Sequence, residues 1–264
     1  MKKQAGLGLV TVCIVGAVGF GCGGGQPLEA FKGATFRIDV GQGSVQQNPP
    51  PADHYLAFVS LLPSASQPCS TLVDGTTATL NGEPGAISVG DCAKANAVPL
   101  ATFEFVAQGD ETRNAVFVWT DGKHRMEVEV QDLLAQYRLE ARKAGFSASA
   151  NPGPDVNPVA HGEVLVFDRK PALAPAQVST ASIEEEREAG NPQYPTLVTN
   201  TYEANATADG AQVSFTVPNQ PPSGPATLTL RVIENHAALR CEGVAQCYTQ
   251  VGMSLESVPV TVSP

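Results

Sequence analysis

The stretch "NAVFVWTDGKHRMEVEV", residues 114–130, decides how the rest of the chain is interpreted. Residues 126–130 alternate apolar and polar side chains, as a half-buried strand does, and residues 115–119 form a second strand-like run, all of it apolar. Between the runs stands Asp121-Gly122, a pair that reaches the positive φ angles of a tight turn at little cost. The stretch therefore predicts a β-hairpin.

The same alternation recurs on both sides of this hairpin. The further alternating runs are residues 35–40, 101–106, 212–217 and 226–232. The further turn pairs are Asp74-Gly75, Asn81-Gly82 and Asp209-Gly210. With 25 glycines and 21 prolines, the chain is interrupted too often for long helices. The sequence predicts a mainly β fold.

The segment after the hairpin, "DLLAQYRLEARKAGF" at residues 132–146, allows two interpretations. Its acidic start, its two leucines and the late Gly145 are typical of a helix. Residues 137–141 also alternate, which is typical of a strand. In a strand, Tyr137, Leu139 and Ala141 would face the core together.

A resemblance bears on this choice. The stretch "TDGKHRMEVEVQDLLAQYRLEARKAGF", residues 120–146, resembles the end of a carboxypeptidase-regulatory-like domain, a small transthyretin-like β-sandwich. The shared pattern runs from Asp-Gly and a strand through a leucine-containing loop to Tyr-x-Leu-x-Ala and Gly-Phe. The resemblance favours a strand at residues 136–143. Because such modules are non-catalytic attachments, it implies no active-site residues.

The second half of the chain has a different organisation. Five prolines crowd residues 152–175 around one strand-like run, which indicates a linker and a domain boundary near Ala150. "SIEEEREAG", residues 182–190, has capping-box spacing and predicts one or two helical turns, whose glutamates we interpret as a solvated face rather than a cation site. From Leu197 onward, short strands resemble a generic immunoglobulin-like sandwich. We therefore expect two β-sandwich modules, residues 34–149 and 150–264.

The N-terminus has the pattern of a lipoprotein signal peptide at residues 1–21. Basic residues precede an apolar run that is shorter than the roughly 20 residues of a membrane-spanning helix. Gly19-Phe20-Gly21-Cys22 resembles the lipobox of bacterial lipoproteins, which implies that Cys22 is lipidated. The residue that follows, Gly23, resembles that of lipoproteins sorted to an outer membrane. Residues 22–33 are then a flexible tether.

Charge and cysteine usage limit the possible partners. The net charge is −10, and removal of the signal peptide takes away two lysines and no acidic residue, so nucleic acid is not an expected partner. An even number of cysteines in an exported chain predicts disulfides. The pairs expected from nearest neighbours are Cys69 with Cys92 and Cys241 with Cys247. A metal site is the competing interpretation, but no C-x-x-C occurs.

Catalytic motifs are absent from the sequence, which has no G-x-S-x-G, no H-E-x-x-H and no P-loop. A triad of Asp53, His54 and a distant serine is conceivable, yet nothing selects it. Glu234 and His236 could share a strand face, but two ligands do not make a metal site. The aromatics that could serve either as core or as a sugar platform are Trp119, Tyr137, Tyr194 and Tyr202. We assign no catalytic residue, metal or cofactor.

The sequence thus predicts a non-enzymatic, lipid-anchored cell-envelope protein that serves binding, adhesion or envelope assembly. Its anchor would be the lipid on Cys22, and its partner an envelope protein or polysaccharide. The expected location is the outer membrane, with a periplasmic or secreted location as the alternative. An exported hydrolase of low motif content and a periplasmic ligand-binding protein are the rival functions.

Overall fold

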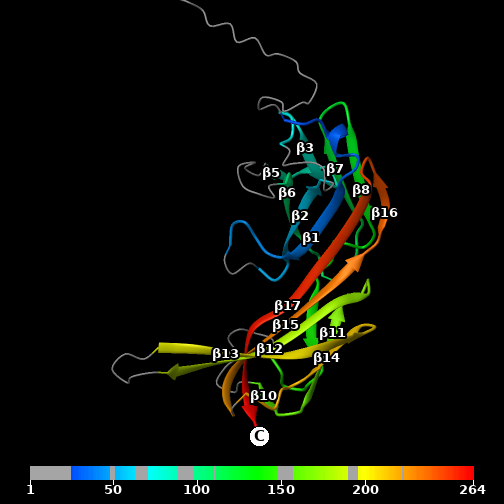
Figure 1. Ribbon diagram of the computed structural model, residues 1–264. Coiled ribbons are helices and arrows are strands. Elements are labelled where there is room, and N and C mark those ends of the chain that lie inside the picture. Colours follow the sequence, from blue (N-terminus) through cyan, green and yellow to red (C-terminus); the bar gives the residue numbers. More distant parts are fainter. Residues whose placement is uncertain are drawn as a thin grey trace, which may run out of the picture.

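The computed structural model describes residues 25–47, 51–63, 71–88, 98–109, 111–147, 157–189, 196–221 and 223–264. Within these ranges the chain is mainly β, as predicted, with a single 3-10 turn, η1 (Leu28–Phe31), and no α-helix (Figure 1). No helix in the described part is long and apolar enough to cross a membrane. The predictions that concern Cys22, Cys69, Cys92, Tyr194 and the boundary near Ala150 lie outside the described residues.

The predicted hairpin is present in the smaller of two sheets. Its strands are β7 (Ala115–Thr120) and β8 (Arg125–Val130), paired antiparallel with Thr120 opposite Arg125. Gly122 has a φ of 82°, which a residue with a side chain rarely adopts. The sheet order is β16 (Ala238–Glu242), β8, β7, β3 (Thr77–Leu80) and β4 (Glu83–Pro84).

The larger sheet contains 12 strands within the described part of the chain. On one side of the C-terminal strand β17 (Gln246–Ser263), the order outward is β1 (Thr35–Gln42), β2 (His54–Leu62), β6 (Leu100–Val106) and β5 (Ala86–Ser88). On the other side the order is β15 (Gly224–His236), β12 (Ala176–Ala189), β13 (Thr196–Asp209), β14 (Gln212–Thr216), β11 (Val164–Lys170) and β9 (Arg138–Ala141). The short β10 (Pro158–Ala160) pairs with the end of β17.

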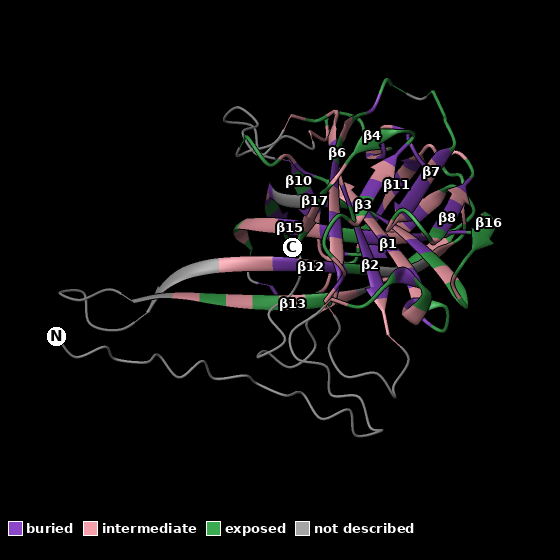
Figure 2. Ribbon diagram, turned by 90° about the horizontal axis from the view of Figure 1, so that it is seen from above, coloured by how far each residue is buried: buried purple, intermediate pink, exposed green. Residues whose placement is uncertain are grey.

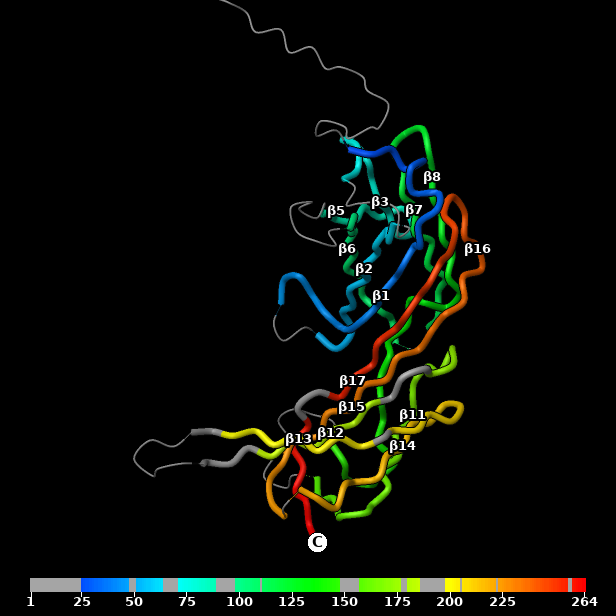
Figure 3. The backbone as a smooth tube through the Cα atoms, in the orientation of Figure 1, coloured from blue at the N-terminus to red at the C-terminus, as the bar shows by residue number. Residues whose placement is uncertain are grey.

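Strand β17 connects the two halves of the larger sheet. Its first residues pair in parallel with β1, from Gln246 opposite Thr35 to Val251 opposite Val40. Along most of its length it also pairs antiparallel with β15. In Figures 1 and 3 the red β17 accordingly runs from the end of the molecule that holds β16 to the opposite end, where the C-terminus lies. Residues at the end of the chain therefore complete a sheet that begins near its start.

The core lies between the sheets. Phe36 of β1 meets Trp119 of β7 edge to face, with ring centroids 6.5 Å apart, and Phe103 meets Phe117 at 5.6 Å. Both pairs join a strand of the larger sheet to a strand of the smaller one, so the two sheets pack face to face. Among the described residues, the buried hydrophobic side chains form a core cluster, and Figure 2 colours the ribbon of buried residues purple. Burial of this apolar surface is the main source of stability.

The ambiguous segment after the hairpin contains a strand, as the resemblance favoured. β9 pairs antiparallel with β11, and within it Leu139 is buried while Arg138 and Glu140 are partly exposed. Tyr137, which precedes the strand, is buried as well. The two leucines that suggested a helix, Leu133 and Leu134, are also buried, but they lie in the connection before β9.

The helical prediction for residues 182–190 is wrong. Strand β12 continues to Ala189, with β13 on one side and β15 on the other for much of its length. Ala181 and Ile183 are buried on alternate positions, which is the pattern of a strand. Pairing with two neighbours satisfies the backbone groups that a local capping box would have satisfied, and tertiary context overrides the weak helical propensity.

Strands β12 and β13 extend beyond their neighbours. The pairing of β12 with β15 ends at Glu184, opposite Thr227, whereas the pairing of β12 with β13 continues to Ala189, opposite Thr196. This two-stranded extension projects from the body in Figures 1 and 2. We call it the arm, which comprises residues 185–189 and 196–200.

Candidate functional site

An ion pair is buried where β11 faces β15. The guanidinium of Arg169 contacts the carboxylate of Glu234 through Nη1 and Oε1, and the two residues are 4% and 0% exposed. Glu234 points inward because β15 alternates, with Val232 and His236 buried on the same face. Charges removed from water in this way are tolerated only when they are paired.

Arg169 also holds two loops in place. Its Nη1 donates a hydrogen bond to the carbonyl of Ala174 at 3.0 Å, and its Nη2 donates to the carbonyl of Gly210. Its Nε atom is buried and has no hydrogen-bond partner among the described residues. One side chain thus connects β11, the loop before β12, the turn between β13 and β14, and β15.

His236 completes the cluster from the same strand as Glu234. Its Nε2 lies 3.2 Å from Oε2 of Glu234, and its ring meets the ring of Tyr137 edge to face with centroids 6.0 Å apart. Burial raises the pKa of Tyr137, and the negative charge of Glu234 raises it further. Tyr137 therefore remains a hydroxyl and donates to the carbonyls of Asp132 and Leu133.

A second tyrosine supports this cluster. The hydroxyl of Tyr55 donates to the carbonyl of Tyr137 at 2.8 Å. Burial raises the pKa of Tyr55 to about 12, so this group also stays protonated at neutral pH. The two phenols fix the backbone around residue 137 and hold it against the buried ionic cluster.

The cluster contains the chemical groups of a catalytic triad without access to a substrate. Thr249 of β17 is directly opposite His236, and its hydroxyl is buried with no partner among the described residues. Hydroxyl, imidazole and carboxylate thus lie close together, but Thr249, His236 and Glu234 are only 1%, 8% and 0% exposed. A catalytic base must reach the proton it removes. In this arrangement all three groups are enclosed in the protein interior.

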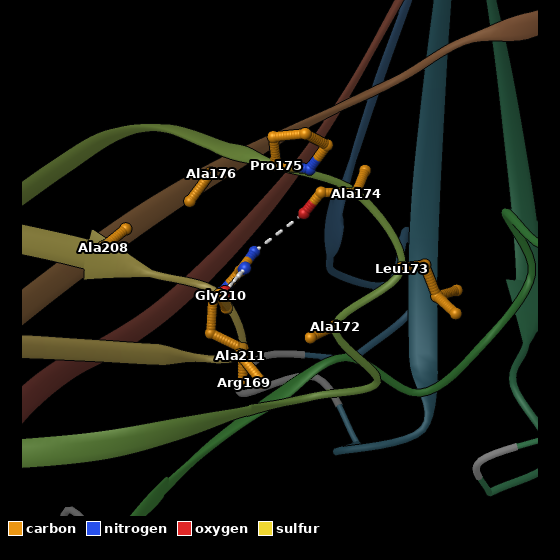
Figure 4. A pocket seen from close by; sticks show the side chains of 9 residues that line it. All are labelled: Arg169, Ala172, Leu173, Ala174, Pro175, Ala176, Ala208, Gly210 and Ala211. Carbon is orange, nitrogen blue, oxygen red and sulfur yellow. Dashed lines mark hydrogen bonds between the residues drawn. The ribbon is translucent and has the colours of Figure 1, made fainter.

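A pocket of about 460 Å³ lies beside Arg169. Its walls come from the loop that precedes β12 and from the turn between β13 and β14 (Figure 4). The lining residues are Arg169, Ala172, Leu173, Ala174, Pro175, Ala176, Ala208, Gly210 and Ala211. Among them only Arg169 is charged, and its two Nη atoms are already engaged. The pocket's other lining residues are alanine, glycine, leucine and proline.

The other three histidines have separate partners. His54 contacts Glu104 at 3.2 Å, His124 contacts Asp121 at 3.1 Å, and Nε2 of His161 lies 2.7 Å from the carbonyl of Pro221. In the described ranges, no group of three or more His, Cys, Asp or Glu side chains is placed to hold a metal ion. Glu234 and His236 do share a strand face, as predicted, but Glu234 is engaged by Arg169.

The aromatic residues considered for a sugar platform lie in different places. Trp119 and Tyr137 are buried, at 0% and 6% exposure, and belong to the core. Tyr202 is half-buried on β13, and its hydroxyl lies 3.5 Å from Oε2 of Glu185. For Trp119 and Tyr137 the core interpretation is therefore correct.

A disulfide between Cys241 and Cys247 joins β16 to β17 and encloses the tip of the hairpin between them. The backbone N–H of Ala245, inside this tip, donates to the carbonyl of Ala34 at 3.0 Å. The disulfide therefore stabilises a loop that contacts the chain just before β1.

One feature that sequence reasoning missed is an open strand edge. On the side of β13 away from β12, pairing with β14 covers only residues 206–209. Residues 196–205 have no pairing strand on that side among the described residues. We call this segment the β13 edge. The β-branched and aromatic residues of "TLVTNTYEAN" indicate a strand, but the helix predicted for residues 182–190 left this strand without a partner.

Neither known protein families nor curated proteins provide a match to this chain.

Proposed function

We propose that this chain is a non-enzymatic, lipid-anchored cell-envelope protein that serves binding, adhesion or envelope assembly. The observation that carries the binding role is the β13 edge, residues 196–205, where backbone donors and acceptors face away from the fold without a pairing strand among the described residues. Such an edge is a template for the addition of another strand. Its partner would be an envelope protein.

The location is supported by the disulfide and by the N-terminal pattern. Disulfides persist in oxidising compartments, so the Cys241–Cys247 bond favours a position outside the cytoplasm. The lipobox-like segment that ends at Cys22 would supply the anchor. A multiply acylated cysteine holds a domain on a membrane, because each buried methylene contributes about 0.8 kcal/mol. The outer membrane is the proposed destination.

Two β-sandwich modules, one transthyretin-like and one immunoglobulin-like, remain part of this proposal. Pairing of β16 with β8 and of β17 with β1 suggests how they would be composed. The first module would consist of residues 34–149, apart from β9, which pairs with β11, together with the hairpin formed by β16 and the start of β17. The second would hold β15, β12 and β13 and the strands that pair with them.

Replacement of the lipidation residue tests the anchor. Cys22→Ala should abolish metabolic labelling with palmitate and move the protein from the detergent phase to the aqueous phase. Cys13→Ala, within the predicted signal peptide, is the matched control and should leave both unchanged. If the wild-type protein carries no lipid, the proposed location changes to periplasmic or secreted.

An activity screen tests the non-enzymatic character. Generic ester, peptide and glycoside substrates should show no turnover above background. Robust turnover that disappears on replacement of one histidine or serine would establish the exported hydrolase instead. His236→Gln is the most informative variant, because His236 lies beside Glu234 and opposite Thr249.

The pocket beside Arg169 favours a second candidate, a periplasmic ligand-binding protein. Its volume of about 460 Å³ and its alanine-rich walls would accept a small apolar ligand. Ala211→Leu should fill part of it and weaken the binding of an apolar fluorescent probe without any change in anchoring. If the probe binds equally well to this variant, the pocket is not the binding site.

A further inference from the structure

The free edges of β12 and β13 differ in charge. The edge of β12 beyond the pairing with β15 is short, residues 185–189, and contains three glutamates and one arginine. The β13 edge contains ten residues, and Glu203 is its only charged residue. Natural proteins protect exposed edges with charge, proline or short length. One edge has such protection and the other does not.

The side chains of the β13 edge fall into two rows. Thr199, Thr201 and Glu203 are exposed on one face, and Val198 and Tyr202 are half-buried on the other. The segment between residues 196 and 205 has no proline, glycine or lysine. Its β-branched and aromatic residues are those favoured in strands.

We infer that the β13 edge pairs with the same edge of a second copy of this chain, antiparallel about a two-fold axis at Asn200. This inference rests on the proposed binding function and names the partner that the edge receives. In such an isologous contact, a residue that lies a given number of positions before Asn200 is opposite the residue of the second copy that lies the same number of positions after Asn200. Val198 then lies opposite Tyr202 of the second copy, and Thr199 lies opposite Thr201.

These cross-strand pairs are of the stabilising kinds. An aromatic residue opposite a β-branched residue, and threonine opposite threonine, both favour strand pairing. Each pair occurs twice because of the symmetry. Glu203 is opposite position 197 and not another acidic residue, so no like charges oppose each other.

The neighbouring registers are less favourable. With the axis at Thr201, Asn200 would be opposite Tyr202 and Val198 opposite Ala204, which breaks the aromatic and β-branched pair. With the axis at Thr199, Val198 would be opposite Asn200. An axis between two residues would put side chains of opposite faces against each other, which an antiparallel pair does not allow.

The arm separates the two bodies in this arrangement. Because the arm projects from the body (Figure 2), a second copy that approaches antiparallel places its own body at the far end of the first arm. The acidic edge of β12 lies on the opposite side of the arm from the contact.

Cysteine cross-linking of the full chain in its membrane tests the register. With the axis at Asn200, the two residues at this position face each other with Cβ atoms about 5 Å apart. Asn200→Cys should therefore give a covalent dimer on a non-reducing gel after mild oxidation. In Glu203→Cys the two cysteines are six strand positions apart, about 20 Å. This variant should remain at the background set by the wild-type cysteines.

Charged pairs test the same contact without cysteines. Thr199→Lys with Thr201→Lys places like charges opposite each other twice, whereas Thr199→Lys with Thr201→Glu places opposite charges there. Both sites are exposed, so both variants should fold, with equal melting temperatures at concentrations at which the chain is monomeric. In sedimentation velocity of the full chain in detergent, the Kd of the dimer should differ by about tenfold or more, with the Lys/Glu variant tighter.

Three results would overturn the inference. These are a wild-type chain that stays monomeric at all concentrations, equal cross-linking of Asn200→Cys and Glu203→Cys, and equal dimerisation of the two charged variants. If cross-linking at Asn200 instead joins the chain to a different envelope protein, the second copy is the wrong occupant and the proposed binding function stands. If neither a second copy nor another envelope protein is found at the β13 edge, the observation that supports the proposed binding function no longer does so.

Discussion

Arg169 and Glu234 form an ion pair whose side chains are only 3% and 0% exposed, although 65 positions separate them in the sequence. The pair connects β11 to β15, strands that are not neighbours in the larger sheet. It thereby fixes the distance between the turn after β13 and the inner face of β15. Most other ion pairs of the described residues, such as that of Lys32 with Glu29, lie on the surface.

Removal of one member of this pair should be strongly destabilising. Arg169→Met leaves the carboxylate of Glu234 buried with only His236 beside it, and urea denaturation should show a loss of about 3 to 5 kcal/mol in the free energy of unfolding. Arg169→Met combined with Glu234→Leu removes both charges and should recover much of this loss. Lys32→Met at the exposed pair is the control and should have little effect. A single variant as stable as the double variant would mean that the buried charges are not coupled.

The burial of Leu139 in β9 gives a second prediction. Leu139→Ala should cost about 2 to 5 kcal/mol, because it removes buried methyl groups and leaves a cavity. Glu140→Gln, at the neighbouring exposed position, should cost less than about 1 kcal/mol. Chemical denaturation measures both. If Leu139→Ala costs less than about 0.5 kcal/mol, Leu139 is not part of the core, and the resemblance to a carboxypeptidase-regulatory-like domain fails with it.

Asp121 should make stability dependent on pH in acid. Its carboxylate accepts backbone hydrogen bonds from His124, Leu28 and Lys123, and these hold its pKa below the ordinary value of 3.8. A depressed pKa means that the contribution is complete above pH 3.8 and is lost as the pH falls toward the folded-state pKa.

The comparison of wild type with Asp121→Asn tests this contribution. The wild type should be more stable at neutral pH, and the difference should shrink below the ordinary pKa of 3.8. Asp74→Asn, at an exposed turn, should not change the acid-unfolding curve. A stability difference between wild type and Asp121→Asn that is constant across this pH range would contradict the prediction.

The disulfide should contribute modestly because its loop is short. A separation of six residues corresponds to about 2.4 kcal/mol in the chain-entropy model. Cys241→Ser with Cys247→Ser should therefore lower the free energy of unfolding by about this amount. Addition of a reductant should lower the stability of the wild type similarly. If the reductant lowers the stability of the double variant as well, another disulfide in the chain contributes.

Local structure was predictable where neighbouring residues specify it. The hairpin at residues 114–130 follows from two strand-like runs and a turn pair whose glycine takes a positive φ. The pairing of Cys241 with Cys247 follows from their closeness in sequence. The burial of Leu139 follows from alternation with its charged neighbours, once β9 is a strand.

Residues 182–189 show where local signals were misleading. Ser182 and Glu185 have the spacing of a helix cap. A local pattern contains this spacing but no information about the strands that pair with the segment. The structure instead pairs Ser182 with Glu203 on one side and with Thr229 on the other. These partners are distant in sequence, so the backbone hydrogen bonds that decide the conformation cannot be seen in the segment itself.

Alternation and turn residues thus determined, from the sequence alone, that the chain is mainly β and which faces of several strands are buried. Only the tertiary structure determined which residues of other strands pack against those faces. Alternation places Glu234 and His236 on one face of a strand, but it does not specify that Arg169 arrives from β11 to neutralise the carboxylate, nor that Thr249 is opposite His236. Strand pairing is a long-range choice among many similar edges, and its free energy comes from contacts that exist only after the chain has folded.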